Sequence, residues 1–254
     1  MKKRIAIITG ASGGIGRAFT RLMLSEDIDE IWAIARSKEK LLVLQADFGA
    51  KVIAISKDLA HSAGLDALSG RLKAEAPVVA YLINNAGIAQ MGDSKDFPAE
   101  VIETSVFINC CTPAVLCSMC IPYMERGSRI LNISSVASFQ PLPNLNLYAA
   151  SKVFLRSYSR SLHWELKPLG ITSTAVCPGW VDTELLKKEV NGKRIKFPGI
   201  VSPKKVAAKA LRDAKKGRDM SVCTLFAKWE HLMAKLIPQR LYMGLWVLVS
   251  KPYR

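Results

Sequence analysis

Ser135, Tyr148 and Lys152 supply the groups of a proton-transfer site: a hydroxyl, a phenol and an ammonium. Tyr148 and Lys152 stand four positions apart in a pattern that predicts a helix, so their side chains share one face. A phenol has a pKa of about 10 in water, too high for ready proton exchange at neutral pH. A nearby ammonium stabilises the phenolate and lowers that pKa, which makes Tyr148 a candidate general acid/base. Ser135 could hydrogen-bond the oxygen that is reduced or oxidised.

The same spacing also occurs where a surface aromatic ring packs on a lysine stem, so the surrounding elements must decide. Residues 129–135 are apolar and β-prone, which predicts a buried strand with Ser135 at its carboxyl end. Pro141 and Pro143 then break the chain before the helix that carries Tyr148. These elements can bring the three groups to one edge of a sheet.

A glycine-rich turn near the amino terminus predicts a nucleotide site. It joins an expected strand over residues 3–9 to a helix, and it carries Gly10, Gly14 and Gly16. Such a turn lets the backbone approach a pyrophosphate at the helix N-terminus. Ser12 and Ile15 are further candidate contacts in the same turn. A tight turn in an unrelated α/β domain is the alternative, since the spacing differs from the commoner dinucleotide fingerprint.

The end of the second expected strand, residues 30–35, bears on the choice of cofactor. In a dinucleotide fold this end faces the adenosine ribose, where an acid binds the 2′-hydroxyl and an arginine accommodates a 2′-phosphate. No acid stands there, and Arg36 with Ser37 therefore favours NADP over NAD; a solvated arginine is the alternative. After the next strand, Asp58 and Leu59 are expected near the adenine, although Asp58 could simply cap the following turn.

Strands and helices alternate along most of the chain. Strands are expected over 51–55, 78–83 and 172–177, with helices over 65–74 and 98–124. This alternation is typical of an α/β fold with a doubly wound, parallel, Rossmann-type sheet. A length of 254 residues fits a single dinucleotide-binding catalytic domain over 1–254.

The long helix over 98–124 is expected to be irregular in its middle. Pro113 cannot donate a backbone hydrogen bond to the carbonyl four residues earlier, which belongs to Asn109. That carbonyl could hold a water that carries protons towards Lys152, or Pro113 could only kink the helix.

Two segments extend the expected sheet. A stretch rich in lysine and arginine, about 182–205, follows a late strand and is expected to act as a substrate lid, with a disordered basic loop as the alternative. An apolar C-terminal extension covers about 222–254. Its first half places four apolar residues on one helical stripe: Leu225, Trp229, Leu232 and Leu236. We expect this extension to close the substrate pocket or a dimer interface; peripheral contact with a membrane is the alternative.

Composition sets further bounds. The formal net charge of +15 suggests acidic partners, but no nucleic-acid recognition motif accompanies it, so no nucleic acid is expected. Cys117 and Cys120 have a redox or zinc spacing inside an apolar helical run without a second pair, so buried thiols and no metal site are expected. No export signal and no run of the roughly 20 apolar residues of a membrane span are expected, which favours the cytoplasm.

Together these segments resemble the short-chain dehydrogenase/reductase family. The resemblance rests on six motifs in order, from residue 3 to about residue 183: TGASGGIG at 9–16, NNAG at 84–87, Asn109, Ser135, Tyr148 with Lys152, and Pro178-Gly179 with Thr183. It implies a nicotinamide dinucleotide, which Arg36 predicts to be NADP(H), and a catalytic tetrad of Asn109, Ser135, Tyr148 and Lys152.

The resemblance also implies roles for single residues. Tyr148 would exchange a proton with the substrate oxygen, Lys152 would bind the nicotinamide ribose and tune the phenol, and Asn109 would support a water relay. Further cofactor contacts would come from Asn85, Ala86, Gly87, Pro178, Gly179, Val181 and Thr183. A homo-oligomer, dimer or tetramer, is expected. Ser138 departs from the family, which often has glycine there, so the wall beside the substrate is expected to differ.

Apolar residues beside this site favour an apolar substrate. They are Phe139, Pro141, Leu142, Leu145 and Leu147. We therefore expect an oxidoreductase that interconverts a ketone and a secondary alcohol on a steroid-like or long-chain compound, as a hydroxysteroid dehydrogenase does. The basic lid would suit an anionic end, so a 3-oxoacyl thioester reductase is an alternative. A non-catalytic NADP-binding sensor or scaffold is the alternative from another class.

Overall fold

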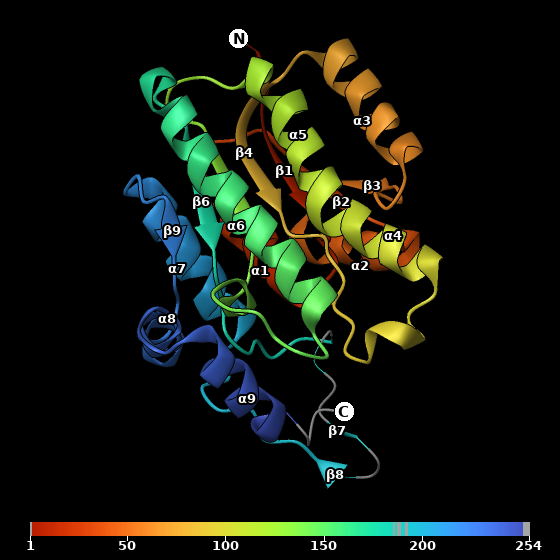
Figure 1. Ribbon diagram of the computed structural model, residues 1–254. Coiled ribbons are helices and arrows are strands. Elements are labelled where there is room, and N and C mark those ends of the chain that lie inside the picture. The colour runs from red at the N-terminus through yellow and green to blue at the C-terminus, as the bar shows by residue number, and fades with distance from the viewer. Residues whose placement is uncertain (1, 185, 187–188, 191–192, 251–254) are drawn as a thin grey trace.

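Seven parallel strands form one sheet in the order β3-β2-β1-β4-β5-β6-β9 (Figure 1). The computed structural model describes residues 2–184, 186, 189–190 and 193–250. The strands are β1 (Arg4–Thr9), β2 (Glu30–Ala35), β3 (Val52–Ser56), β4 (Val78–Asn84), β5 (Arg129–Ile133), β6 (Thr172–Val176) and β9 (Met220–Ser221). The predicted single-domain α/β fold with a doubly wound, parallel sheet is confirmed.

Helices cover both faces of the sheet (Figure 1). On one face, α1 (Gly14–Met23), α2 (Lys38–Phe48) and α7 (Pro203–Lys215) enclose a core that includes Phe19, Leu41 and Val206. On the other face lie α3 (Ser62–Glu75), α4 (Ala99–Val106), α5 (Thr112–Cys120) and α6 (Asn146–Leu166). The second core includes Leu68 and Leu162. Strand residues alternate between the two cores, because successive side chains of a strand point to opposite faces.

Strand order reverses between β1 and β4, and a threonine hydroxyl joins the ends of these two strands. Thr9 Oγ1 accepts hydrogen bonds from the backbone N–H groups of Asn85 (3.0 Å) and Ala86 (2.9 Å). The Asn85 side chain donates in return to the carbonyls of Thr9 and Gly10, both at 3.1 Å. Ligands of doubly wound sheets bind outside the carboxyl ends of the strands at such a reversal. Thr9 therefore fixes the shape of this crevice.

The long helix that the sequence predicts over 98–124 is interrupted. A π-helical turn, η2 (Phe107–Cys111), separates α4 from α5, and the N–H of Thr112 donates to the carbonyl of Phe107. Pro113 follows in the first turn of α5. The combined helix Ala99–Tyr123 is long and apolar enough to cross a membrane by length and composition, and half of its most apolar stretch is buried inside the protein, as in a core helix.

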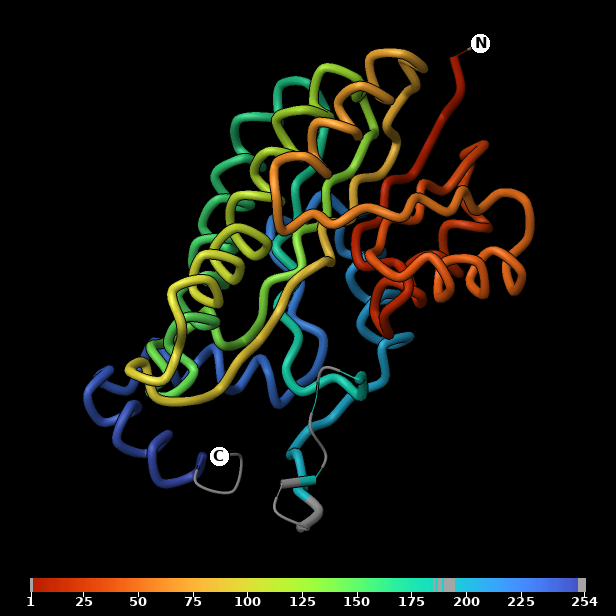
Figure 2. Tube along the Cα trace, turned by 90° about the vertical axis from the view of Figure 1, so that its right-hand side faces the viewer, coloured from red at the N-terminus to blue at the C-terminus, as the bar shows by residue number. Residues whose placement is uncertain are grey.

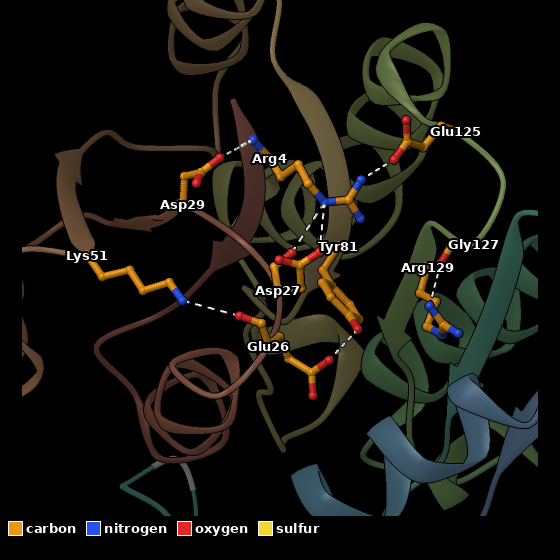
Figure 3. A network of polar contacts seen from close by, with 9 residues as sticks. All are labelled: Arg4, Glu26, Asp27, Asp29, Lys51, Tyr81, Glu125, Gly127 and Arg129. Atoms are coloured by element: carbon orange, nitrogen blue, oxygen red, sulfur yellow. Dashed lines mark hydrogen bonds and ion pairs between the residues drawn. The ribbon is translucent and has the colours of Figure 1, made fainter. Parts of the chain in front are cut away.

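The amino ends of the strands are held by a polar network (Figure 3). Arg4 pairs with Glu125, and its backbone N–H donates to Asp29 at 2.7 Å. Tyr81 donates to the carboxylate of Glu26 at 2.6 Å. Burial and this carboxylate raise the pKa of Tyr81 to about 12. This end of the sheet is thus closed by ion pairs and hydrogen bonds, which leaves the carboxyl end for ligands.

The two ends of the segment after β6 are joined to each other. Val181 and Val201 form a parallel bridge, and the N–H of Val201 donates to the carbonyl of Trp180 at 2.9 Å. Between them, β7 (Glu189–Val190) and β8 (Lys193–Arg194) pair in antiparallel fashion. The expected lid of 182–205 thus spans this hairpin, but residues 185, 187–188 and 191–192 lie outside the described part.

Two helices complete the chain at the carboxyl end of the sheet (Figures 1 and 2). They are α8 (Leu225–Leu236) and α9 (Gln239–Val249). The inner side of α8 packs through Ala227 and Ala234 against Phe139. The predicted apolar stripe of α8 points outward instead: Leu225 is 83% and Leu236 is 66% exposed. Residues 251–254 of the expected extension lie outside the described part.

The Thr9 hydroxyl generates the first prediction. Thr9→Val keeps the shape of the side chain but leaves two partly buried N–H groups, those of Asn85 and Ala86, without their acceptor. We expect the free energy of unfolding to fall by about 1–3 kcal/mol. Urea unfolding measures this difference, and Thr9→Ser, which retains the hydroxyl, is the control. A valine variant as stable as the wild type would show that Thr9 does not hold the crevice together.

Candidate active site

The glycine-rich turn between β1 and α1 is closely packed. Gly10 has a φ of +61°, in the left-handed region that favours glycine. A Cβ at Gly16 would lie 2.2 Å from the carbonyl oxygen of Gly10, so only glycine fits there. The helix begins after Gly13, and its N-cap provides no side chain to cap the first N–H groups. These amides can therefore bind an anion such as a pyrophosphate.

The turn also touches the segment after β6. A Cβ at Gly14 would lie 2.7 Å from Thr183 Cγ2 and 3.3 Å from Pro203. Val181, two residues earlier, is 9% exposed. The structure thus brings Gly14 and Thr183, predicted from distant motifs, to one place. Ser12 and Ile15 are partly buried in the same turn.

The predicted adenosine end lies beyond β2 and β3. The side chain of Arg36 is exposed, and no ion pair holds it among the described residues. Ser37 caps α2, because its hydroxyl accepts from the N–H of Lys40 at 3.1 Å. The Asp58 carboxylate accepts from the N–H of Ala60 at 2.9 Å, so it caps its turn as the alternative interpretation proposed. Leu59 is buried, with its carbonyl accepting from Thr112.

Lys152 lies buried on α6 at the carboxyl end of β5. Its Nζ donates to the carbonyl of Ile133 at 2.8 Å, and Ser134 Oγ donates to the carbonyl of Lys152 at 2.8 Å. Burial lowers the pKa of Lys152 to about 8, because the charged ammonium loses its water. Lys152 is therefore a cation at neutral pH, and it loses its proton at a pH not far above neutral.

Asn109 sits on the π-helical turn and bonds to the chain after β4. It accepts from the N–H of Ile88 at 3.0 Å and donates to the carbonyl of Ile88 at 2.9 Å. Gly87 lies beside it: a Cβ at this glycine would be 2.8 Å from Asn109 Oδ1 and 3.4 Å from Lys152 Nζ. The predicted residues Asn109, Gly87 and Lys152 are thus adjacent. The predicted water at the Asn109 carbonyl stays a prediction.

Tyr148 lies one turn before Lys152 on α6, and Lys152 Nζ is 5.5 Å from the centre of its ring. Burial raises the pKa of Tyr148, while a hydrogen bond with Ser135 opposes that rise. The pKa of Tyr148 is thus raised rather than lowered as expected, because the loss of water on burial is the largest influence on it. A raised pKa keeps the phenol protonated at neutral pH, ready to donate.

Ser135 begins a short 3-10 turn, η4 (Val136–Ser138), rather than continuing the strand as expected. Its hydroxyl accepts from the N–H of Ala137 at 3.1 Å, and its carbonyl accepts from Ser138 Oγ at 2.6 Å. The N–H of Val136 donates to the carbonyl of Pro178 at 3.0 Å. Gly179 follows, and a Cβ added to it would lie 3.8 Å from the Cβ of Ala227 on α8. The turn thus connects Ser135 to the Pro178-Gly179 motif.

An apolar wall stands beside Tyr148. Leu142, Leu145 and Ala149 pack with Tyr148 and with two aromatic residues of α9, Tyr242 and Trp246. Trp246 Nε1 donates to the carbonyl of Pro143 at 3.0 Å, which fixes α9 against the loop before α6. Phe139 joins the next cluster, with its ring 4.3 Å from that of His231.

The short chain dehydrogenase family matches residues 4–194 of this sequence. The chain belongs to this family. A short chain dehydrogenase of Pseudocercospora fijiensis is 32% identical over 192 residues, which are 73% of this chain and 62% of that protein. The very-long-chain 3-oxoacyl-CoA reductase of Anas platyrhynchos is 32% identical over 203 residues, which are 72% of this chain and 61% of that protein. The match spans less than two thirds of both relatives.

A solved structure agrees with the family. The short-chain dehydrogenase of Sphingobium yanoikuyae in complex with NADPH has a TM-score of 0.78 and 29% identity. The similarity covers 94% of this chain and 95% of that chain. The fold, including the seven-stranded sheet, is thus that of the short-chain dehydrogenases, and the chain is an oxidoreductase of this family.

Several residues around the site were not predicted from the sequence. Thr9 shapes the crevice, and Ser134 and Ser151 bond to the backbone of α6 beside the lysine. Cys177 is buried at the end of β6, where burial raises its pKa to about 11. Ser134 and Ser151 are next to the predicted residues Ser135 and Lys152 in the sequence, and this proximity was the signal that could have identified them. No such signal pointed to Cys177, because a buried cysteine after a strand is common.

The cysteines of the described structure are not grouped with side chains that could bind a metal ion. Cys117 and Cys120 are buried, and burial raises the pKa of the Cys117 thiol to about 12. In the described part of the chain, no three His, Cys, Asp or Glu side chains are grouped to hold a metal ion. Cys117 instead contacts Asn84 and Asn132 in the core.

Glu230 on the inner side of α8 generates a prediction about pH. Its Oε2 has no hydrogen-bond partner in the described structure, and burial raises its pKa from 4.5 to about 7. The folded state therefore holds this proton more tightly than the unfolded chain. Its contribution to stability is present below pH 4.5 and is lost as the pH rises through about 7.

Glu230→Gln should remove this loss and make the protein more stable at pH 8 than the wild type. We expect a gain on the order of 1–2 kcal/mol, reduced from the full shift because the side chain is partly exposed. Thermal or urea unfolding between pH 5 and pH 8 measures it. Glu103→Gln, at an exposed position of α4, is the control. If stability changed with pH equally in the wild type and in Glu230→Gln, this result would contradict the burial of an unpaired carboxyl group.

Proposed function

We propose that this chain is an NADP(H)-dependent oxidoreductase that interconverts a ketone and a secondary alcohol on an apolar substrate. One observation carries the proposal. Tyr148, Ser135, Lys152 and Asn109 meet at the carboxyl end of β5, next to the crevice between β1 and β4 where the glycine-rich turn lies. A nucleotide held in that crevice would place its reactive end beside a proton donor.

The residues around the crevice fit a dinucleotide. The turn of Gly10, Gly14 and Gly16 would present helix N–H groups to a pyrophosphate, because no side chain of the N-cap hydrogen-bonds to them. The contacts expected from the sequence further along the crevice are Asn85, Ala86, Gly87, Pro178, Gly179, Val181 and Thr183. When bound, a nicotinamide would exchange a hydride with the substrate carbon. Arg36 is exposed and unpaired in the described structure, so it can reach a 2′-phosphate. The NADPH complex of the Sphingobium relative supports NADP.

The proton steps belong to the chain itself. Tyr148 holds its proton at neutral pH, since burial raises its pKa, and would donate it to the substrate oxygen in the reductive direction. Ser135, bonded to the phenol, would orient that oxygen. Lys152 is held by the Ile133 carbonyl and would bind the nicotinamide ribose while adding positive charge beside the developing phenolate. Asn109 would support the position of the lysine, because Gly87 lies close to both side chains.

The substrate is proposed to be apolar, steroid-like or long-chain. The wall of Leu142, Leu145, Tyr242 and Trp246 beside Tyr148 supports this, because it offers contact to hydrocarbon and little hydrogen bonding. The segment 182–205 is proposed to act as the lid, with its base fixed by the Val181–Val201 bridge. Its basic residues would suit an anionic end of the substrate.

A 3-oxoacyl thioester reductase is the second candidate. The relative from Anas platyrhynchos is named as a very-long-chain 3-oxoacyl-CoA reductase, and a long acyl chain would fit the same apolar wall. A sensor or scaffold without catalysis is a weaker alternative, because such a protein would have no chemical use for Tyr148. Following NADPH absorbance with ketosteroids, medium-chain ketones, 3-oxoacyl thioesters and sugars separates these candidates.

A homo-oligomer, dimer or tetramer, in the cytoplasm is part of the proposal. Apolar side chains on the outer face of α6 support the oligomer: Val153 is 39% and Phe154 is 43% exposed. Light scattering of the purified protein gives its mass in solution.

Tyr148→Phe removes the proposed proton donor and leaves the ring. We expect turnover to fall by at least about 100-fold, the size typical of general acid/base catalysis, with NADPH affinity retained. Steady-state kinetics and NADPH fluorescence titration measure the two quantities. Tyr158→Phe is the matched control, since this tyrosine lies on the same helix but donates to the Ala114 carbonyl in the core. Turnover near the wild-type value in Tyr148→Phe would remove the phenol from the mechanism.

Arg36→Asp replaces the proposed phosphate ligand by a group that repels phosphate. We expect the ratio of kcat/KM for NADPH over NADH to fall by roughly 100-fold, because charge-assisted bonds to phosphate are lost. Lys38→Asp changes the charge equally at an exposed position nearby and is the control. A wild-type enzyme that prefers NADH would show that Arg36 does not select the cofactor.

A further inference from the structure

The outer faces of α8 and α9 carry apolar side chains that cover nothing in the described structure. Each of these side chains is between 51% and 83% exposed. They are Leu225, Trp229, Leu232 and Leu236 on α8, and Leu241, Leu245, Leu248 and Val249 on α9. Their spacing of three and four residues makes one stripe on each helix.

These stripes are not needed for the protein's own core. The inner sides of both helices are already packed: Ala227 of α8 joins a cluster at the end of β6, and Tyr242 and Trp246 of α9 pack on α6 and the loop before it. Solvent-exposed stripes of this size on consecutive helices are costly in water and mark an interaction surface. The partner must therefore be found outside the single chain.

The charges around the stripes select the partner. Lys228, Lys235 and Arg240 are exposed on α8 and α9. Glu230, the one acidic residue in the described part from Leu225 to Ser250, points inward with a buried carboxyl oxygen. A second copy that paired through the same face would bring like charges together, since a two-fold interface is self-complementary. A negatively charged surface matches both the stripes and their basic flanks.

The lengths of the two helices suit binding at a membrane surface and are too short to cross a membrane. α8 has 12 residues and α9 has 11, whereas a membrane span needs about 20. Trp229, half-exposed among leucines, has the mixed polarity that favours the boundary between lipid headgroups and acyl chains. Both helices lie at the carboxyl end of the sheet, the end that holds the candidate site (Figure 1).

We infer that α8 and α9 form an interfacial anchor that binds the surface of an anionic lipid bilayer, with their leucines among the acyl chains and their lysines at the headgroups. Docking in this way turns the carboxyl end of the sheet towards the bilayer. An apolar substrate could then enter from the lipid; that consequence rests on the proposed function, whereas the binding does not.

Cosedimentation with vesicles tests the anchor without using enzyme activity. The wild-type protein is mixed at low salt with vesicles of phosphatidylcholine and phosphatidylglycerol, or with vesicles of phosphatidylcholine alone. We expect binding to the anionic vesicles, weaker binding at high salt, and little binding to the neutral vesicles. Leu232→Glu with Leu245→Glu should weaken binding to anionic vesicles by at least roughly tenfold, because it places charges at the acyl boundary.

The control variant combines Leu42→Glu with Leu169→Glu. These leucines are 49% and 54% exposed, against 51% and 55% for Leu232 and Leu245, but they lie on other surfaces. Circular dichroism checks that both variants fold. No binding of the wild type to anionic vesicles, or equal losses in the two variants, would overturn the anchor. A dimer seen by light scattering that only Leu232→Glu with Leu245→Glu dissociates, without vesicle binding, would assign the stripes to self-association instead.

Discussion

The ammonium of Lys152 is buried at the carboxyl end of the sheet, and no carboxylate pairs with it among the described residues. An unpaired buried charge is expensive, and a protein keeps one only where the surroundings supply dipoles in its place. Here the carbonyl of Ile133 accepts a hydrogen bond from the ammonium. The neighbouring elements depend on this arrangement. Gly87 has no Cβ that would meet Asn109, and Ser134 holds the helix at the lysine carbonyl.

The two ends of the sheet divide stability and chemistry between them. At the amino end, Arg4 pairs with Glu125 and Tyr81 donates to Glu26, so these contacts stabilise this end of the sheet (Figure 3). At the carboxyl end, the N–H groups of the glycine-rich turn lack a side-chain cap and the Arg36 guanidinium lacks an ion pair in the described chain. Unused polar groups that converge at one edge are what a charged ligand can bind, and the reversal of strand order gathers them there.

Periodicity and residue type predicted much of this architecture. The strand over 30–35 agrees with β2 at both ends, and the helix that carries Tyr148 and Lys152 is present, beginning two residues before Tyr148 at Asn146. Local features with weak sequence signals were missed: the two-residue strand β9 and the 3-10 turn after Ser135. Pro113 indicated an interrupted helix but not the π-helical turn, because a missing donor can be accommodated in several ways.

Two features could not be derived from spacing alone, for a physical reason. Spacing shows which residues of a helix share a face, but not which face the rest of the chain covers. Leu225 and Leu236 therefore share a stripe as predicted, while the small residues Ala227 and Ala234 make the contact with Phe139. The pKa of Tyr148 was expected to fall because a lysine is near; burial of the phenol, which depends on the whole fold, raises it.

The account depends on a buried, weakly held proton on Lys152, and NMR can observe that proton. Protein labelled with carbon-13 at the ε position of lysine is titrated without cofactor, and the resonance missing from Lys152→Met identifies Lys152. The account predicts a titration near pH 8, well below the ordinary lysine pKa of 10.5. A titration near 10.5 would show that the ammonium is solvated, and it would contradict the arrangement from which the site was derived.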